Sequence, residues 1–458
     1  MKSPKKLPLL LSALAAAPAL TAQERPNIVF FLVDDMGIGD ISVYGQRYIS
    51  TPNLENLARE GMVFTQAYAG CTVSAPSRGS LLTGKHTGHS YIRGNKDTPN
   101  PDGHVYDRAL KASEYTLGEM LQSAGYHTAC IGKWGLGGPG TEGAPNSQGF
   151  DYFYGYLGQL NAHDHRPPFL HENGTEIKLD GKVFAQDLFV EKALKYLDER
   201  AGEKDTPFFL YFTPALPHAD LDIDEEERMA YDGKFLEAAK PSLQGYKPVE
   251  HPLSTYAAMV SRIDKDVRRL IDALEKNGQL DNTIFIFSSD NGAHMEGGHD
   301  PFFFDGNGPF RGTKRDLYEG GIRTPFIVRW PGVVRPGSVS YHVCAFWDLF
   351  PTFSEIAGQK VAPDTDGISI LPTLTGKGEQ KEHGYLYWEF EEEGGKQAVR
   401  VGDWKLIKLQ INNPDKSRYE LYDLSADPGE EHDVSAQYPD LVTRYARLID
   451  AAHTPWVE

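Results

Sequence analysis

Short apolar runs recur along the chain, each long enough for a strand but too short for a typical helix. They are rich in β-branched and aromatic residues and are apolar at consecutive positions. Strands of this composition are buried on both faces, which is typical of parallel sheets. We therefore predict buried parallel strands at residues 27–33, 208–212, 283–288 and 325–329.

Helical patterns lie between these runs. Residues 51–60 open with Thr-Pro, a favourable helix start, and residues 116–124 end before Gly125. Residues 255–277 form a long amphipathic pattern that ends before Gly278. This alternation of strands and helices predicts an α/β fold in which helices cover both faces of a sheet.

The pattern changes after about residue 375. Polar turns then separate short stretches with the composition of antiparallel strands, and a final helical pattern runs from residue 439 to about 452. We predict a catalytic domain at 23–375 and a smaller α+β subdomain at 376–458. The strands expected in the subdomain are 385–390, 398–401, 405–409 and 419–422.

The first 22 residues have the features of a secretory signal peptide. Lysines precede an apolar stretch at residues 7–20, and Ala22 is suited to the last position before cleavage. The alternative is a membrane anchor, but the stretch is shorter than the ~20 apolar residues that span a bilayer. We expect an exported protein, periplasmic or secreted, without a stable membrane anchor.

Composition narrows the range of partners. The 458 residues carry a formal net charge of −18, which argues against nucleic-acid binding because that requires a basic surface. The net charge does not exclude anionic substrates, since a basic pocket can lie in an acidic protein. Three cysteines are too few for a disulfide scaffold, so we expect buried free thiols.

Acidic residues follow two of the predicted strands. Asp34 and Asp35 come directly after the first, and Asp290 and Asn291 come after 283–288. Each pair is also compatible with a solvated turn, but adjacent buried carboxylates require a cation. Oxygen ligands at the carboxyl edge of a sheet favour a hard cation, and several protein ligands favour calcium over magnesium. No Cys/His cluster has the spacing of a zinc site.

The strongest motif runs from Ser74 to Arg78 (SAPSR) and continues as GSLLTG. Alone it predicts a proline turn before a helix. It also resembles the signature of the type I sulfatases of the alkaline phosphatase superfamily: Cys or Ser, any residue, Pro, any residue, Arg, then a Leu-Thr-Gly helix. Ser74 stands at the nucleophile position. Cys71 does not, because Val73 rather than a proline follows it by two residues.

The resemblance extends over nearly the whole chain after the signal peptide, with its motifs in the expected order. It implies a large mixed β-sheet sandwiched by helices, as in alkaline phosphatase, with a smaller C-terminal α+β subdomain. The implied activity is that of a sulfuric ester hydrolase. The further segments that carry the resemblance are 26–39, 131–137, Pro217-His218, 289–292, 310–332 and 419–434.

The resemblance implies that Ser74 is oxidised to formylglycine by a serine-type sulfatase-maturating enzyme, which uses radical S-adenosylmethionine chemistry. The aldehyde hydrates to a gem-diol. One hydroxyl attacks sulfur and displaces the alcohol, which gives a covalent enzyme–sulfate ester. Deprotonation of the other hydroxyl regenerates the aldehyde and expels sulfate, an exit that an ordinary serine ester lacks.

The resemblance also assigns roles to the surrounding residues. Arg78 orients the gem-diol, and Lys133 and Lys314 bind sulfate oxygens. His218 binds sulfate and, with Lys314, is a candidate acid for the leaving oxygen. One Ca²⁺ ion lowers the pKa of the attacking hydroxyl. Its implied ligands are Asp34, Asp35, Asp290, Asn291 and the modified Ser74.

One position departs from the family pattern. The family has a histidine that contacts the gem-diol where this chain has Gly135. The residue that removes the proton during sulfate release is therefore left open. His163 and His165, two residues apart in a predicted loop, are the candidate substitutes.

Two alternative functions share features of this sequence. A phosphomonoesterase or phosphodiesterase of the same superfamily would use unmodified Ser74, but such enzymes typically bind two zinc ions through several histidines, a set that this chain lacks. A non-catalytic glycan-binding protein would have no need of a nucleophile or of the charged residues around it.

Export and the resemblance to bacterial arylsulfatases and N-acetylgalactosamine-6-sulfatases favour a sulfated carbohydrate substrate. We expect galactose sulfate or N-acetylgalactosamine sulfate. The candidate sugar contacts are His163, Asp164, His165, Arg166 and His299.

Overall fold

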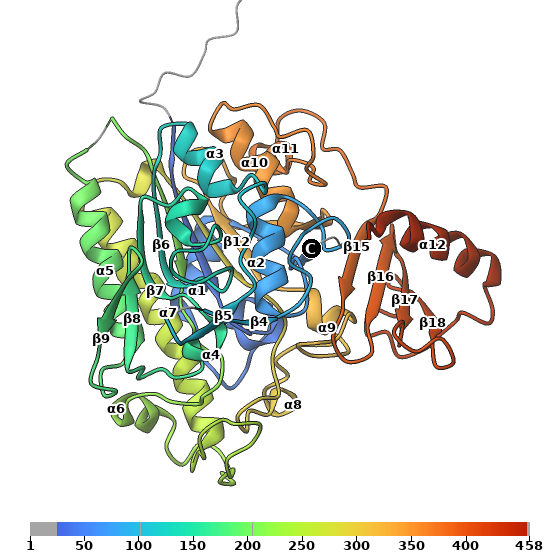
Figure 1. The fold of residues 1–458 in the computed structure, drawn as a ribbon, viewed down its shortest axis with the longest axis horizontal. Coiled ribbons are helices and arrows are strands. Elements are labelled where there is room, and N and C mark those ends of the chain that lie inside the picture. Colours follow the sequence, from blue (N-terminus) through green and yellow to red (C-terminus); the bar gives the residue numbers. More distant parts are fainter. Residues whose placement is uncertain (1–24, 101, 204, 456–458) are drawn as a thin grey trace, which may run out of the picture.

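The computed structural model describes residues 25–100, 102–203 and 205–455, so the predicted signal peptide lies outside the described residues. A ten-stranded mixed sheet runs through the larger part of the protein, with helices on both faces (Figure 1). A separate four-stranded sheet forms the C-terminal part. The predicted fold class is therefore confirmed. The order of the large sheet is β13-β2-β12-β11-β1-β10-β6-β7-β8-β9.

The centre of the large sheet consists of five parallel strands. The predicted runs at 27–33, 208–212 and 283–288 are three of them, and every residue of these three strands is buried. In sheet order the five are β11 (Thr283–Ser289), β1 (Asn27–Val33), β10 (Phe208–Thr213), β6 (His127–Lys133) and β7 (Tyr152–Tyr156).

The fourth predicted run differs from the expectation. It forms β12 (Phe326–Arg329), which is antiparallel to β11 rather than parallel. The chain leaves β11 at the carboxyl edge of the sheet and re-enters β12 from that same edge, which fixes the opposite direction. An apolar run specifies burial and carries no information on direction.

Shorter strands extend both sides of the parallel centre. On one side β2 is antiparallel to β12, and on the other β8 and β9 form a hairpin next to β7. Two ribbons lie outside the large sheet. The bounds are β2 (Met62–Phe64), β13 (Ser338–Ser340), β8 (Phe169–Glu172), β9 (Thr175–Lys178), β3 (Ala67–Tyr68), β14 (Cys344–Ala345), β4 (Asp97–Pro99) and β5 (Val105–Asp107).

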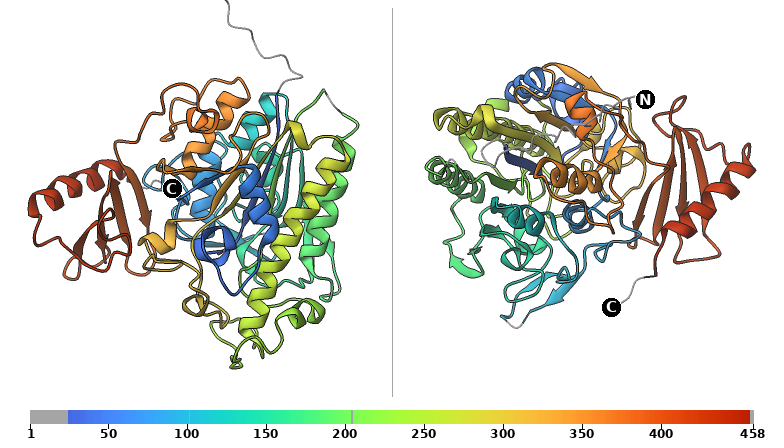
Figure 2. Two further views of the ribbon diagram at one scale, coloured as in Figure 1. Left: turned by 180° about the vertical axis from the view of Figure 1, so that it is seen from behind. Right: turned by 90° about the horizontal axis from the view of Figure 1, so that it is seen from above.

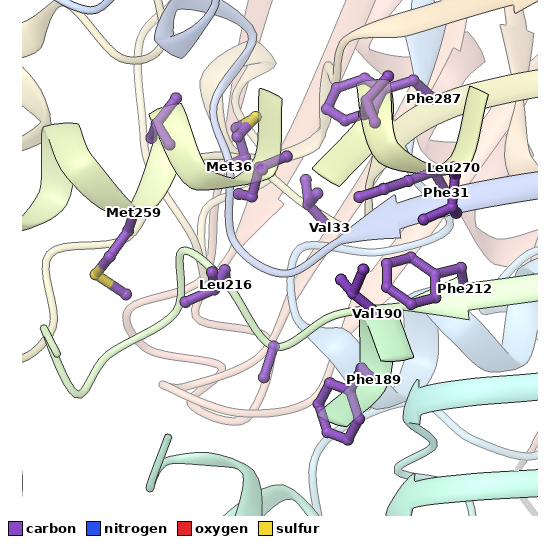
Figure 3. Close-up of a cluster of buried hydrophobic side chains, with 14 of the residues drawn as sticks. Phe31, Val33, Met36, Phe189, Val190, Phe212, Leu216, Met259, Leu270 and Phe287 are labelled. Atoms are coloured by element: carbon purple, nitrogen blue, oxygen red, sulfur yellow. The ribbon is translucent and has the colours of Figure 1, made fainter. Parts of the chain in front are cut away.

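Successive side chains of β1 point to opposite faces of the sheet and therefore pack in two different cores. Phe31 packs in a cluster beneath α1 (Pro52–Glu60), α5 (Ala185–Arg200) and α7 (Pro252–Lys276), as Figure 3 shows for the α5 and α7 side. Phe30 faces the opposite core. That core is covered by α2 (Ser74–Thr83), α3 (Leu117–Ser123), α10 (Leu349–Ile356) and α11 (Leu371–Thr375).

The helices predicted at 51–60, 116–124 and 255–277 are confirmed as α1, α3 and α7. Of the described helices, none is long and apolar enough to cross a membrane. The cysteines are free and buried, as expected. The remaining short helices are α4 (Gln159–Ala162), α6 (Glu225–Arg228), α8 (Pro301–Phe304) and α9 (Glu319–Ile322).

The C-terminal sheet is antiparallel and lies beside the large sheet (Figure 2). One of its faces packs against the main domain through Trp388 and Ile407, and the other carries α12 over Tyr387 and Leu406. The elements are β15 (Leu386–Phe390), β16 (Lys396–Val401), β17 (Trp404–Leu409), β18 (Arg418–Asp423) and α12 (Pro439–Ala452).

A buried ion-pair network joins the two parts. Lys405 on β17 lies 3.0 Å from a carboxylate oxygen of Glu319 on α9 and 3.0 Å from one of Glu430, and all three side chains are inaccessible to solvent. Burial raises the pKa of Glu430 to about 7, against the opposing effect of Lys405. The lysine therefore offsets the cost of two carboxylates that have no access to water.

Replacing Lys405 by methionine is expected to lower the free energy of unfolding by about 3–5 kcal/mol, because it removes the cation paired with buried Glu430 and leaves Glu319 with Arg323 alone among its ion-pair partners in the described residues. Chemical denaturation checks this. Lys408→Met, on the same strand but partly exposed, is the matched control and should change stability by less than ~1 kcal/mol. Equal losses in the two variants would contradict the role of the network.

Candidate active site

Four adjacent parallel strands, β11, β1, β10 and β6, end at one edge of the sheet, and charged residues follow each of them. The carboxyl ends of parallel strands are where α/β folds place ligands. Because the strands are adjacent, residues far apart in the chain meet there. These residues are Asp290 and Asn291 after β11, Asp34 and Asp35 after β1, His218 after β10, and Lys133 at the end of β6.

Three carboxylates form the centre of the site. One oxygen from each of Asp34, Asp35 and Asp290 lies within 4.8 Å of the others, and all three residues are completely buried. Burial, followed by the charge of Asp34, raises the pKa of Asp290 to about 7. Like charges this close and this dry are unfavourable unless a cation stands among them.

The chemistry of the donors fits such a cation. Asn291 donates from Nδ2 to Asp35 Oδ1 over 2.8 Å, while its Oδ1 is buried without a hydrogen-bond partner among the described residues. An amide oxygen without a partner beside three carboxylates is a set of hard oxygen ligands. These four residues could therefore hold a hard divalent cation.

Ser74 lies beside the carboxylates at the first position of α2. Its Oγ donates to Asp34 Oδ1 over 2.8 Å, and Lys133 Nζ is 3.2 Å from the same Oγ and 2.6 Å from Asp34 Oδ2. Burial alone would raise the pKa of Asp34, but the Lys133 ammonium and other cations hold it well below its usual range. The positive end of the α2 dipole also favours negative charge at Ser74.

Arg78, one turn further along α2, fixes the helix against the sheet. Its Nε and Nη2 donate to Asp290 Oδ2 over 3.0 and 2.9 Å, and its Nη1 donates to the Lys133 carbonyl over 2.8 Å. The guanidinium is completely buried. Its donors are therefore committed to holding one carboxylate and the end of β6 in place around Ser74.

Lys314 and His218 lie beside Asp35. Lys314 Nζ donates to Asp35 Oδ2 over 2.7 Å and lies 3.1 Å from His218 Nε2. Because an ammonium only donates, His218 Nε2 is an acceptor and the ring proton is on Nδ1. Burial and the Lys314 charge hold the pKa of His218 well below its usual range, so the imidazole is neutral.

Comparison with known proteins decides the family. A model of the sulfatase family matches residues 26–359, and a model described as "N-sulphoglucosamine sulphohydrolase, C-terminal" matches residues 310–450. The chain belongs to the sulfatase family. It is a sulfatase, as the motif around Ser74 predicts.

Several relatives cover most of this sulfatase. An N-acetylgalactosamine-6-O-sulfatase of Bacteroides thetaiotaomicron is 30% identical and the match covers 94% of each chain. The N-acetylgalactosamine-6-sulfatase of Mus musculus is 32% identical over 88% of this chain and 75% of its own. The crystal structure of Ps i-CgsB has a TM-score of 0.79 at 28% identity and covers 93% of this chain and 92% of its own.

Two of the predicted sugar contacts of the sulfatase lie around His218. The ring of His163 stacks on that of His218 with centroids 4.8 Å apart, and His165 Nε2 is 2.9 Å from the His218 carbonyl oxygen. Burial lowers the pKa of His163 to about 3, with a further contribution from Lys133, so this ring is neutral. His163 therefore reaches the site, whereas His165 contacts its backbone.

The other three predicted sugar contacts have different surroundings. Asp164 is 2.7 Å from Lys247 Nζ, and Arg166 forms ion pairs with two carboxylates at 3.0 and 2.7 Å. His299 is buried, and its ring stacks on Tyr256 with centroids 3.5 Å apart. These three side chains are therefore held by other protein groups, and their role as sugar contacts stays a prediction.

Sequence reasoning missed Glu296. Its Oε2 accepts from Lys314 Nζ over 2.8 Å and lies 3.5 Å from His218 Nε2, and its other oxygen pairs with Arg315. Burial lowers the pKa of Lys314, but Asp35 and Glu296 together raise it above its usual range. Glu296 stands in an ordinary loop sequence, and no local pattern distinguishes it.

We expect calcium to raise the melting temperature of the chelator-treated sulfatase, and to raise it more at pH 8 than at pH 6. In the metal-free fold the pKa of Asp290 is raised to about 7, above its unfolded value. Metal-free stability therefore falls as the pH rises through this range, whereas binding requires the ionised form. A concentration 100 times the Kd adds about 2.7 kcal/mol.

Asp290→Asn should lose most of the calcium response. Asp40→Asn is the matched control, because burial also raises the pKa of Asp40 to about 7 while its Oδ2 accepts from Tyr256 rather than facing the cluster. It should keep the response. A calcium effect of equal size at both pH values, or its survival in Asp290→Asn, would contradict the assignment.

Proposed function

We propose that this sulfatase removes sulfate from a sulfated carbohydrate, using formylglycine formed from Ser74 and one bound Ca²⁺ ion. The observation that supports the proposal is the environment of Ser74 Oγ. This oxygen is buried between the Asp34 carboxylate, to which it donates a hydrogen bond, and the Lys133 ammonium. A site of this kind suits a nucleophile activated at neutral pH.

The proposed substrate is galactose sulfate or N-acetylgalactosamine sulfate within a glycan. Support comes from the relatives, whose names specify N-acetylgalactosamine-6-sulfate and N-acetylglucosamine-6-sulfate. A similar structure was solved with k-i-k-neocarrahexaose, and another with its substrate D-glucosamine-2-N,6-O-disulfate. All of these names refer to sulfated sugars or to oligosaccharides.

We infer that the cation is calcium, held by Asp34, Asp35, Asp290, Asn291 and the modified Ser74. It would supply positive charge that polarises a sulfate oxygen and lowers the pKa of the nucleophile. Formylglycine would supply a hydrated aldehyde whose two hydroxyls serve attack on sulfur and release of sulfate.

Lys133 and Lys314 would bind the sulfate oxygens, Lys133 from beside Asp34 and Lys314 from beside Asp35. Lys133 is 3.2 Å from Ser74 Oγ, and Lys314 is tied to Asp35 and Glu296. Both ammonium groups are buried, where a fixed charge stabilises a charged transition state more strongly than in water. Arg78 keeps the nucleophile and the Lys133 strand end in register.

The leaving oxygen needs a proton when the S–O bond breaks. His218 Nε2 accepts from Lys314 in the resting arrangement, so the proton that the pair shares is held on Lys314. We infer that His218 binds sulfate and that His218 and Lys314 together are the candidate acids for the leaving oxygen.

Residues 1–22 are proposed to export the protein to the periplasm or the medium, after a serine-type maturating enzyme has acted on Ser74. An exported enzyme has access to extracellular glycans, which suits a sulfated carbohydrate substrate. The signal sequence carries this part of the proposal.

The deciding experiment is coexpression with a serine-type maturating enzyme, followed by a screen of mono-sulfated sugars and matched phosphate esters in the presence of calcium. Peptide mass should show residue 74 about 2 Da lighter than serine, because two hydrogens are lost. We expect sulfate release from a mono-sulfated galactose or N-acetylgalactosamine and no activity in Ser74→Ala. Phosphate release by protein that retains serine would instead support the phosphatase alternative.

Lys314→Ala should lower kcat/KM by about 10²–10³-fold, the usual cost of removing one buried group that stabilises transition-state charge. Steady-state kinetics on the sulfated sugar checks this. Lys195→Ala is the control, since Lys195 on α5 is exposed and pairs with Glu199, which is also exposed. It should stay within about two-fold of the parent. A Lys314→Ala variant with the kinetics of the control would remove this role.

A further inference from the structure

Gly135 leaves a space beside the nucleophile that another residue fills. It follows Lys133 by two positions and has a φ of +75°, a conformation that favours glycine. A Cβ added there would lie 2.3 Å from Nε2 of Gln159. The carboxamide of Gln159 therefore occupies the volume of the side chain that residue 135 lacks.

Gln159 and Asp107 form a polar pair with unused hydrogen-bonding capacity. The backbone N–H of Gln159, at the start of α4, donates to Asp107 Oδ2 over 2.9 Å. Gln159 Nε2 and Asp107 Oδ1 are both buried without a hydrogen-bond partner among the described residues. Leaving such atoms unpaired costs about 1–3 kcal/mol each, so they indicate a place where a ligand atom completes the network.

The pair lies on the Lys133 side of the site. Asp107 Oδ2 is 3.8 Å from the same added Cβ at Gly135. Burial raises the pKa of Asp107 to about 7, the Gln159 N–H and the Lys133 ammonium oppose the rise, and Asp97, opposite on β4, adds to it. The charge of Lys133, which contacts Ser74 Oγ, therefore affects the pKa of Asp107.

We propose that Gln159 takes the place of the side chain absent at Gly135 and donates from its free Nε2 to an oxygen of the sulfate or of the nucleophile, while Asp107 holds it there. Gln159 is then a catalytic residue and Asp107 a positioning residue. The identity of the accepting oxygen rests on the proposed function. The finding that Gln159 occupies the space at Gly135 does not depend on that function.

A purely structural filler would explain the geometry equally well, so the experiment combines stability and kinetics. The shared volume is tested on protein with unmodified Ser74, using Gly135→Ala, Gln159→Ala and the double variant. Gly135→Ala should lower the melting temperature more than Gly140→Ala does. Gly140 is a matched control in the same loop, with a φ of +73° and open space around an added Cβ.

Adding Gln159→Ala should remove the excess loss caused by Gly135→Ala, because it removes the atom that the new Cβ meets. The claim that Gln159 occupies the space at Gly135 is wrong if Gly135→Ala lowers the melting temperature no more than Gly140→Ala does. It is also wrong if the double variant keeps the whole excess loss. This test does not depend on any sulfatase activity.

The catalytic role is tested on the matured enzyme. Gln159→Ala should lower kcat by on the order of 10²-fold, the cost of one lost donor to transition-state charge. Gly135→His should be inactive in the parent, where Gln159 blocks it, yet should raise the activity of Gln159→Ala, where the space is free. Asp107→Asn should cost nothing further in the Gln159→Ala background, because Asp107 acts through Gln159.

Outcomes for the two proposals are distinguishable. Full kcat in Gln159→Ala, with sulfate release intact in the parent, would overturn the role of Gln159 and leave the proposed function standing. A parent that releases no sulfate from any ester would overturn the proposed function, and the catalytic role of Gln159 with it. In that case the melting-temperature comparison still decides whether Gln159 occupies the space at Gly135.

Discussion

The site depends on the burial of three carboxylates against three cations at one edge of the sheet. Asp34, Asp35 and Asp290 repel one another in a region without water, and the repulsion is offset locally by Arg78, Lys133 and Lys314. Lys133 pairs with Asp34, Lys314 pairs with Asp35, and Arg78 pairs with Asp290 and, at 3.6 Å, with Asp34. The arrangement fixes the side chains before a ligand arrives, and it leaves an amide oxygen of Asn291 and the Ser74 hydroxyl directed at the same centre. A cation, sulfate or both can then bind with little rearrangement.

The fold brings these charged residues together at one edge of the sheet. Parallel strands all end at one edge, so four short segments of chain converge without long loops, and helix α2 adds its positive end at Ser74. The C-terminal sheet contributes from outside: Lys405 pairs with Glu319 on α9, which follows the loop that carries Lys314. Packing of the small sheet against the main domain is thereby coupled to the position of Lys314, the lysine proposed to bind sulfate. The subdomain is part of the site's support, although none of its residues was assigned to the chemistry.

Sequence reasoning succeeded where a local pattern reflects the physics directly. The apolar runs identified β1, β10, β11 and β12, although not β6 or β7, and Asp34, Asp35, Asp290 and Asn291 were assigned together because strand ends share an edge. It failed where the cause is not local. The direction of β12 depends on how the preceding loop returns. Glu296 could not be found because only the folded loop brings it to Lys314.

Gly135 illustrates why a departure from a family motif is not by itself a loss of function. Neighbouring groups interact with the volume and the hydrogen-bond donor of a side chain, and the backbone position that carries the side chain matters little. Here a glycine with left-handed φ opens the volume, and a glutamine from α4 enters it with a donor that the protein leaves unpaired. Read along the chain, positions 135 and 159 have no relation. Their relation exists only as a contact between the loop after β6 and helix α4, which is why the sequence showed an absence at Gly135 and the structure shows a replacement.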